Sequence, residues 1–446
     1  MKPSNCLGKG FVLLNLIHIS LCFTDYTGYR LVRFDANADV AKWLENEEEF
    51  GYNIDTVHGS RRTLVDVWGE PSKPKGVADV LVAPEIYNDF VKDLKRKGAD
   101  NIQILRNDIQ EDIRRERRSL KESAKRRKRS IQSYSDFDIE DFHSYDEMVQ
   151  FMRRLSEEKP ELVTLMNVSR SSEGRMIYGV KIGTSNGMRP AIFVDAGIHA
   201  REWIAPAAAL YMIKALVDKY GKENKITQSI NKFDWFIVPE VNPDGYEYSR
   251  STDRLWRKTR SRNVTVNRWC VGADANRNWG FRWGEAGANR QPCSNIYAGS
   301  SPFSEPEIRG LRDFLNWKVP QLIIYTSLHS YGQLLLAPWG YTAEKTNNFQ
   351  DQRAAARVAV EAMRNATGVQ YKFGTISELM YPASGTSIDY LQHKGVPYIY
   401  GIELRPLDSD NSFAFNLPAT FIKPSGEEML AGLIAMGEYA VKHKRL

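Results

Sequence analysis

Residues 191–203 read AIFVDAGIHAREW, and this stretch decides the predicted fold. Its first six residues are apolar apart from Asp195, as expected of a strand inside a sheet that is covered on both faces. A helix rich in Ala and Leu is predicted directly afterwards, over residues 204–220. A buried strand followed at once by a helix is typical of the α/β class.

The same alternation continues along the chain on both sides of this stretch. It predicts a mixed, mostly parallel, twisted sheet with helices on both faces. The further predicted strands are 177–182, 233–238, 322–326 and 396–402, and the further predicted helices are 305–317, 354–366 and 425–441.

Residues suited to metal chemistry follow three of the predicted strands. Ligands of such sheets bind beyond the carboxyl ends of the strands. His199 and Glu202 are spaced to face one point, and His329 would complete a His₂Glu zinc site with an open fourth position, the catalytic kind. Each histidine alone is more often a hydrogen-bonded polar residue than a ligand, so the combination carries the prediction. Glu403 is either salt-bridged or a general base beside the metal, because an unpaired buried acid is costly.

The N-terminal segment has the pattern of a secretory signal peptide. An apolar stretch at 11–23 follows Lys2 and Lys9, and small residues precede a cleavage point near Cys22. We therefore expect a signal peptide over residues 1–22 and a secreted, extracellular protein; a short buried helix is the alternative. No apolar run reaches the roughly 18 residues of a membrane span, so a multi-pass membrane protein is excluded.

A second boundary is predicted at a basic run. A charged helix with little to bury begins near Ile109, and it ends in basic residues that lead to Arg129 and Ser130. Because this run separates two composition regimes, we expect cleavage between Arg129 and Ser130, although a solvated charged face is the ordinary explanation of such runs. Residues 115–118 offer a second dibasic cut. The predicted units are a signal peptide over 1–22, a pro-domain with its basic connecting segment over 23–129, and a catalytic domain over 130–446.

The pro-domain is predicted to be a small α+β unit. Its expected elements are strands at 27–34, 62–68, 77–82 and 101–105, and helices near 39–50 and between 85 and 98.

Charge and cysteine content limit the function classes. The net charge of +6 is divided unevenly. Residues 1–129 hold 24 basic and 20 acidic residues, and residues 130–446 hold 37 basic and 35 acidic residues. The larger part of the chain therefore has no excess of positive charge that would indicate nucleic-acid binding. Beyond the predicted signal peptide only Cys270 and Cys293 remain. Because a secreted protein is exposed to an oxidising compartment, we expect these two cysteines to form one disulfide; two free buried thiols are the alternative. Sequons at Asn167, Asn263 and Asn365 are compatible with glycosylation.

Seven motifs carry a resemblance to a known family. In chain order they are GIHAREW, VNPDGYEYS, RLWRKTRS, CVGADANRNW, LHSYGQLLL, YPASGTSID and GIELR. The chain resembles the secreted zinc metallocarboxypeptidases of the pancreatic carboxypeptidase A and B family, from the signal segment to the final helix. The resemblance implies a carboxypeptidase-like fold, hydrolysis of the C-terminal peptide bond, one Zn²⁺ per catalytic domain, and a pro-domain that inhibits its own enzyme. A trypsin-like or dibasic-cleaving protease is the implied activator.

The resemblance also assigns roles to single residues. His199, Glu202 and His329 match the zinc ligands. Glu403 matches the glutamate that takes a proton from the attacking water and passes it to the leaving amine. Arg257 matches the residue that stabilises the oxyanion.

A second set of residues matches substrate-binding positions. Asn276, Arg277 and Tyr381 match the groups that hold the terminal carboxylate, and a planar guanidinium suits that task because it binds a carboxylate in fork geometry. The resemblance makes further substrate-binding residues of Arg201, Ser330 and Tyr331, places Asp274 behind His199 as an orienting carboxylate, and pairs Cys270 with Cys293.

Substrate preference depends on Ile388, which matches the floor of the specificity pocket. That position is apolar in A-type enzymes and acidic in B-type enzymes, and burying an unpaired Lys or Arg head against an apolar floor costs several kcal/mol. We therefore expect aromatic or large aliphatic C-terminal residues. A B-type preference is the alternative, because Asp389 is adjacent and Glu378 is near. A catalytically silent peptide-binding protein is a second alternative.

Three positions depart from the pancreatic enzymes. Pro406 follows Arg405 where the resemblance implies a cis peptide bond, and proline lowers the cost of the cis form. Gly332 and Gly401 also differ.

Overall fold

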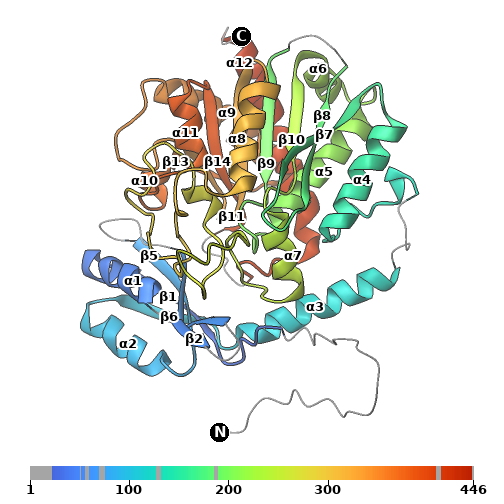
Figure 1. The fold of residues 1–446 in the computed structure, drawn as a ribbon. Coiled ribbons are helices and arrows are strands. Elements are labelled where there is room, and N and C mark those ends of the chain that lie inside the picture. Colours follow the sequence, from blue (N-terminus) through green and yellow to red (C-terminus); the bar gives the residue numbers. More distant parts are fainter. Residues whose placement is uncertain are drawn as a thin grey trace, which may run out of the picture.

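The chain forms a small N-terminal unit and a much larger α/β unit that pack together (Figure 1). The predicted signal peptide and the predicted cleavage site at Arg129 and Ser130 lie outside the described residues. In the part of the chain that is described, no helix is long and apolar enough to cross a membrane. The computed structural model describes residues 23–50, 52–55, 60–69, 76–126, 132–184, 189–407 and 413–443.

The small unit is an antiparallel sheet of four strands in the order β4-β5-β1-β6. Two helices cover one face, because Val40 and Leu44 of α1 and Phe90 and Leu94 of α2 share a core with the strands. The predicted strand at 62–68 is interrupted and contributes to both β3 and β4. The elements are β1 (Arg30–Ala36), α1 (Ala38–Phe50), β2 (Tyr52–Asp55), β3 (Ser60–Thr63), β4 (Val65–Gly69), β5 (Gly76–Val82), α2 (Tyr87–Arg96) and β6 (Asp100–Arg106).

Helix α3 (Ile109–Arg126) follows the small unit, as the basic run predicts. The expectation that this helix has little to bury is wrong. Ile109 and Ile113 are buried in a cluster with Leu255 and Ala414 of the large unit. These two isoleucines lie four residues apart on one face of the helix, so a narrow apolar contact is hidden among charged residues.

The large unit is built on a sheet of eight strands in the order β13-β12-β14-β11-β9-β10-β8-β7. Four of its neighbouring pairs are parallel and three are antiparallel, which confirms the predicted mixed, mostly parallel sheet. The strands are β7 (Val163–Arg170), β8 (Met176–Ile182), β9 (Ala191–Ala196), β10 (Asp234–Val238), β11 (Leu322–Gly332), β12 (Leu334–Ala337), β13 (Lys372–Thr375) and β14 (Tyr398–Leu407).

The central strand β9 shows why helices cover both faces of this sheet. Ile192, Val194 and Ala196 enter one core, whereas Ala191 and Phe193 enter the other, because successive side chains point to opposite faces. The first core is closed by α4 (Tyr145–Glu158), α5 (Ile204–Lys219), α6 (Asn224–Lys232), α9 (Phe349–Thr367) and α12 (Ile422–Lys442), and the second by α8 (Pro306–Lys318) and α11 (Ser387–His393).

Strands β11 and β14 are longer than the sequence predicts. Their apolar runs end at Thr326 and Ile402, but the hydrogen-bonded ladder continues to Gly332 and Leu407. His329 and Glu403 therefore lie within the strands rather than after them. The two are paired in the parallel register, so the sheet itself places them side by side.

Other elements lack a strong apolar run and are not predicted from the sequence. They include α4, β7, α6, α7 (Pro243–Ser251), β12, β13, α10 (Ile376–Leu379) and α11. Two local predictions are confirmed: the Arg405–Pro406 peptide bond is cis, and Cys270 and Cys293 form a disulfide. The disulfide closes a loop inside the long irregular segment between α7 and α8.

Candidate active site

Two histidines and a glutamate meet at the end of the central strands. His199 and Glu202 lie in the turn between β9 and α5, and His329 lies on β11; all three are buried. One donor atom from each lies within 4.8 Å of the others. Gly197 lets β9 leave the sheet at this point, because its φ is +71° and a Cβ atom there would lie 2.4 Å from the Glu240 carboxylate.

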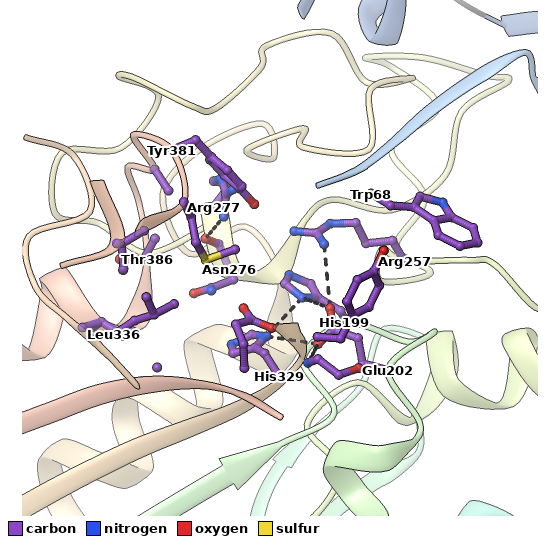
Figure 2. Close-up of a pocket in the computed structure, with 18 of the residues that line it drawn as sticks. Trp68, His199, Glu202, Arg257, Asn276, Arg277, His329, Leu336, Tyr381 and Thr386 are labelled. Atoms are coloured by element: carbon purple, nitrogen blue, oxygen red, sulfur yellow. Dashed lines mark hydrogen bonds and ion pairs between the residues drawn. The ribbon is translucent and has the colours of Figure 1, made fainter. Parts of the chain in front are cut away.

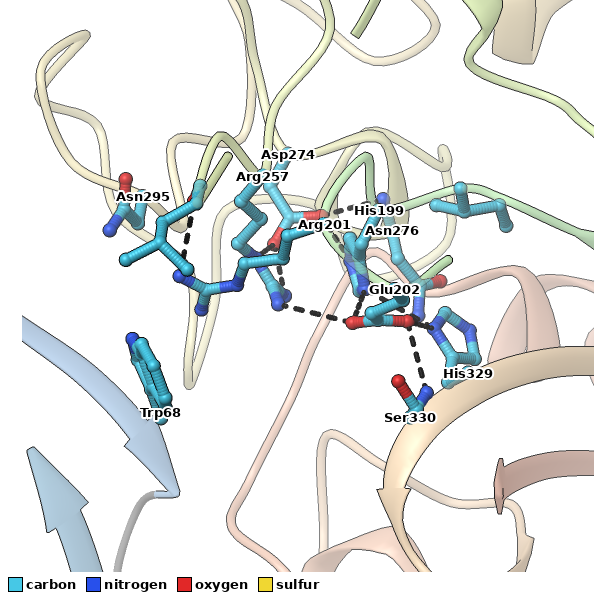
Figure 3. Close-up of polar contacts among 12 residues, drawn as sticks. Trp68, His199, Arg201, Glu202, Arg257, Asp274, Asn276, Asn295, His329 and Ser330 are labelled. Carbon is cyan, nitrogen blue, oxygen red and sulfur yellow. Dashed lines mark hydrogen bonds and ion pairs between the residues drawn. The ribbon is translucent and has the colours of Figure 1, made fainter. Parts of the chain in front are cut away.

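The polar contacts of this cluster direct both imidazoles inward. Nδ1 of His199 lies 2.8 Å and Nδ1 of His329 lies 3.2 Å from the Glu202 carboxylate, and the two Nδ1 atoms are 3.2 Å apart. The outer nitrogens are engaged elsewhere. His199 Nε2 lies 3.1 Å from Asp274 (Figure 3), and His329 Nε2 lies 3.1 Å from Ser327.

This arrangement fits a zinc ion. Two ring nitrogens and a carboxylate converge on one point, which is a donor set that zinc accepts, and carboxylate and hydroxyl partners behind the rings are the usual means of orienting ligands. Burial by itself would raise the pKa of Glu202, but the two histidines lower it well below its ordinary value, so the group is held as a carboxylate.

The cluster opens into a cleft of about 630 Å³ (Figure 2). The cleft is asymmetric, with apolar residues at one end and aromatic residues at the other. Its lining consists of Trp68, His199, Glu202, Arg257, Asn276, Arg277, His329, Ser330, Tyr331, Leu336, Ile376, Met380, Tyr381, Ala383, Thr386, Ile388, Gly401, Glu403 and Phe415.

Arg257 is fixed beside the metal ligands. Its Nε and Nη2 donate to Oδ2 of Asp274 at 3.1 and 2.8 Å, while Nη1 lies 3.9 Å from Glu202. Burial acts to lower the pKa of Arg257, but the Asp274 carboxylate raises it above the ordinary arginine value. Asp274 therefore holds a permanently charged guanidinium and His199 at the same time.

Arg277 lines the cleft and carries a hydrogen-bond donor that has no partner among the described residues. Its Nε donates to the Gly287 carbonyl at 2.6 Å and its Nη1 to the Asn276 carbonyl at 3.0 Å, whereas Nη2 is buried and has no partner among the described residues. The Tyr381 ring lies 5.8 Å from this guanidinium. An arginine that is buried with a free donor is suited to an anionic ligand.

Glu403 lies opposite His329 on the floor of the cleft. Burial raises its pKa above the ordinary glutamate value, and the nearby Glu202 carboxylate adds to this rise; His329 and Arg257 act in the opposite direction. The group is not salt-bridged in the described part of the chain. Of the two explanations that the sequence leaves open, the geometry therefore favours a proton acceptor.

The apolar end of the cleft is formed around Ile388. Leu336 and Ile376 line the same end, and a Cβ atom on Gly401 would lie 2.7 Å from Cδ1 of Ile388. Neither nearby acid lines the cleft: the Asp389 carboxylate accepts hydrogen bonds from the backbone of Gly340 and Tyr341, and Glu378 pairs with Lys345 at the surface.

The small unit contributes to the opposite end of the cleft. Trp68 of β4 lines the cleft and packs against Phe415 with ring centroids 4.9 Å apart, and Phe415 also packs against Tyr331. Arg201 donates to Asp66 at 2.7 Å, two residues before this tryptophan. The sequence does not identify Trp68, Phe415 or Asp66, because each depends on a contact between distant segments. It also does not single out Ser327, although that residue lies only two positions before His329.

The geometry agrees with comparisons to known proteins. Residues 148–432 match the zinc carboxypeptidase family, and residues 54–116 match the carboxypeptidase activation peptide. The chain is 34% identical to bovine carboxypeptidase A1, over 98% of this chain and 99% of the relative. It is 40% identical to carboxypeptidase B of Astacus astacus, over 67% of this chain and 96% of the relative.

Solved structures support the same assignment. The crystal structure of carboxypeptidase A from Helicoverpa armigera superposes with a TM-score of 0.82 at 27% identity, covering 94% of this chain and 99% of that one. A family match covers more than half of the chain, and a relative matches it over nearly its full length. The buried His₂Glu cluster supports the same family. The chain belongs to the zinc carboxypeptidase family and carries that family's activation peptide.

Proposed function

We propose that this protein is the secreted precursor of an A-type carboxypeptidase, which removes aromatic or large aliphatic residues from peptide C-termini. One observation supports the proposal: Arg277, whose buried Nη2 has no partner among the described residues, lines the same cleft as the His₂Glu cluster and an apolar pocket. A C-terminal carboxylate supplies the missing partner, and an internal peptide segment does not.

The roles of the chain's residues follow from their positions. His199, Glu202 and His329 would hold the zinc ion, which when bound supplies Lewis-acid activation of a water molecule and the scissile carbonyl. Glu403 accepts the proton of the attacking water and returns it to the leaving amine; its raised pKa suits both steps. The Arg257 guanidinium stabilises the negative charge that develops on the carbonyl oxygen.

Substrate binding is assigned to the apolar end of the cleft. Arg277, Asn276 and Tyr381 bind the terminal carboxylate, and the last side chain enters the pocket above Ile388. The Asn276 side chain is itself fixed, since its Oδ1 accepts a hydrogen bond from the Ser387 backbone at 3.1 Å. A basic side chain would meet no carboxylate in this pocket, because Asp389 is occupied by backbone amides.

The small unit is assigned the role of an inhibitory pro-domain. Trp68 lines the end of the cleft through which the remainder of a peptide would enter. Cleavage between Arg129 and Ser130, by a trypsin-like or dibasic-cleaving protease, would separate residues 23–129 from the catalytic domain over 130–446. A signal peptide over 1–22 would direct the precursor out of the cell.

The proposal is tested with matched peptides that differ only in their last residue. The mature enzyme should release Phe and Leu much faster than Arg, and it should not act on the same peptides with an amidated C-terminus. Ile388→Asp should shift the preference toward Arg, with Ile139→Asp, outside the cleft, as a matched control. Faster release of Arg by the unaltered enzyme would contradict the A-type assignment, and equal release from amidated peptides would contradict the role of Arg277.

A further inference from the structure

The positive charge of the precursor is concentrated in one short segment. Residues 23–108 hold 12 basic and 16 acidic residues, whereas residues 109–129 hold 10 basic and 4 acidic residues. Residues 130–446 are nearly balanced, with 37 basic and 35 acidic residues. Attraction of a polyanion is therefore expected at the short basic segment, most of which is helix α3.

Helix α3 carries a straight row of basic side chains. Four of them are exposed to solvent and follow one another at spacings of four, three and four residues, which places them on one face of the helix: Arg114, Arg118, Lys121 and Lys125. We call these four residues the basic stripe. At 1.5 Å per residue the stripe is about 16 Å long. Within the described part of the chain, none of the four forms an ion pair.

The acidic residues of α3 do not neutralise this stripe. Asp112 pairs with Arg106 at 2.9 Å, and Glu116 lies against the large unit, where its side chain is only 9% exposed. The other two, Glu111 and Glu122, are exposed and lie beside the stripe rather than within it. The outward face of the helix therefore keeps an excess of positive charge.

The opposite face of α3 is already occupied. Ile109 and Ile113 are buried in a cluster with Leu255, and the helix runs along the edge of the large unit (Figure 1). A helix that binds a membrane surface must insert an apolar face into the bilayer, and α3 has none to spare. The helix also has no aromatic residue on which a nucleic-acid base could stack. What the stripe offers is a linear array of charge.

We infer that the basic stripe binds a sulfated polysaccharide, which retains the precursor outside the cell until cleavage releases the mature enzyme. The inference rests on the proposed function, because secretion brings α3 to such polymers and cleavage after Arg129 removes α3 together with the small unit. Sulfated polysaccharides are linear polyanions, and short segments rich in Lys and Arg are typical of the sites that bind them. The catalytic domain, with its nearly balanced charge, keeps no comparable excess.

The test uses the full precursor, with heparin as the probe. Surface plasmon resonance measures binding at several salt concentrations, before and after cleavage with trypsin. We expect the precursor to bind with an affinity that falls steeply as salt is added, and the mature enzyme to bind at least about tenfold more weakly. Release of Phe from a peptide is measured on the same samples.

A triple variant assigns the binding to the stripe. Arg118→Gln, Lys121→Gln, Lys125→Gln removes three exposed charges from the helix. The slope of log Kd against log salt concentration should fall by about two to three, because each lost contact releases one counterion fewer. Activity after trypsin should equal that of the wild type, since cleavage removes α3.

A second triple variant controls for the change in net charge. Lys92→Gln, Lys95→Gln, Arg96→Gln removes the same number of exposed charges from α2. Its affinity for heparin should stay close to that of the wild type. Equal losses of affinity in the two triple variants would show that only net charge matters, and would overturn the inference.

Further outcomes separate the partner and the underlying function. A mature enzyme that binds heparin as tightly as the precursor overturns the role of the stripe. Stronger binding of the precursor to double-stranded DNA, or to vesicles that contain phosphatidylserine, overturns the choice of a sulfated polysaccharide. Heparin binding that depends on the stripe, without release of Phe after trypsin, contradicts the proposed function and leaves the binding site in place.

Discussion

Two groups of arginine–carboxylate pairs are largely shielded from solvent, and they differ in which parts of the chain they join. Arg257 pairs with Asp274, and Arg405 with Glu428, entirely within the large unit. Arg201 instead pairs with Asp66 of the small unit, and Arg254 pairs with Glu116 of α3. The first group would survive release of the small unit together with α3, whereas the second would be broken by it.

The difference shows that arginine–carboxylate pairs serve two purposes in this molecule, one inside the large unit and one between the units. Removing one partner of a buried pair leaves an uncompensated charge, which costs about 3–5 kcal/mol when the site stays dry. Pairs inside the large unit can therefore fix catalytic groups permanently. Pairs across the units can stabilise only the form in which the units are joined.

Asp274→Asn should give the largest effect, because Asp274 holds both Arg257 and His199. We expect kcat/KM of the mature enzyme to fall by about 10²–10³-fold and zinc affinity by about 10–100-fold. Steady-state kinetics and titration with a chelator measure the two losses. Asp313→Asn, a half-exposed residue on α8, is the control. Wild-type kinetics in Asp274→Asn would show that this internal pair does not support the site.

Glu428→Gln should chiefly affect stability. Its carboxylate is fully buried and accepts hydrogen bonds from Arg405 at 3.0 Å, Thr367 at 2.6 Å and Tyr371 at 2.9 Å. We expect unfolding to require about 3 kcal/mol less free energy. Denaturant titration should show no such loss for the exposed Glu438→Gln on the same helix. Equal stabilities of the two variants would contradict the importance of the internal pair.

Removing the carboxylates of the pairs across the units should affect only the precursor. The double variant Asp66→Asn, Glu116→Gln leaves two arginines without counter-charges, so the small unit should dissociate more readily. We expect the activity of the uncleaved precursor to rise by about tenfold, while the mature enzyme is unchanged. Glu111→Gln on the exposed side of α3 is the control. If the uncleaved double variant is as inactive as the wild-type precursor, these pairs do not contribute to inhibition.

The pH dependence gives the smallest and most specific effect. Glu403 acts as a base only when ionised, and burial raises its pKa above the ordinary value of 4.5. The activity of the mature enzyme should therefore fall as the pH drops, and the fall should begin above pH 4.5, at about tenfold per unit below the pKa. A pH profile of kcat/KM measures it. A profile that stays flat down to pH 4.5 would contradict the raised pKa.

The sequence predicts the sheet, the zinc residues and the apolar pocket, but not the contacts between the units. His199 and Glu202 follow a strong apolar run, so their place at a strand end could be inferred, whereas Glu403 lies within β14 rather than after it. The pairing of His329 with Glu403 across β11 and β14 depends on strand register, which the apolar runs do not fix. The pairs Arg201–Asp66 and Arg254–Glu116 each join residues more than 130 positions apart, and nothing local to either residue indicates its partner.

The most direct test of the account is the release of Phe from a peptide by the purified precursor, before and after trypsin, with and without a zinc chelator. The account predicts little release before cleavage, rapid release afterwards, and loss of that release when the chelator removes zinc. Equal release before and after cleavage would contradict inhibition by the small unit. Release that persists in the chelator, with zinc shown to be absent, would contradict the central claim that the His₂Glu cluster is a catalytic zinc site.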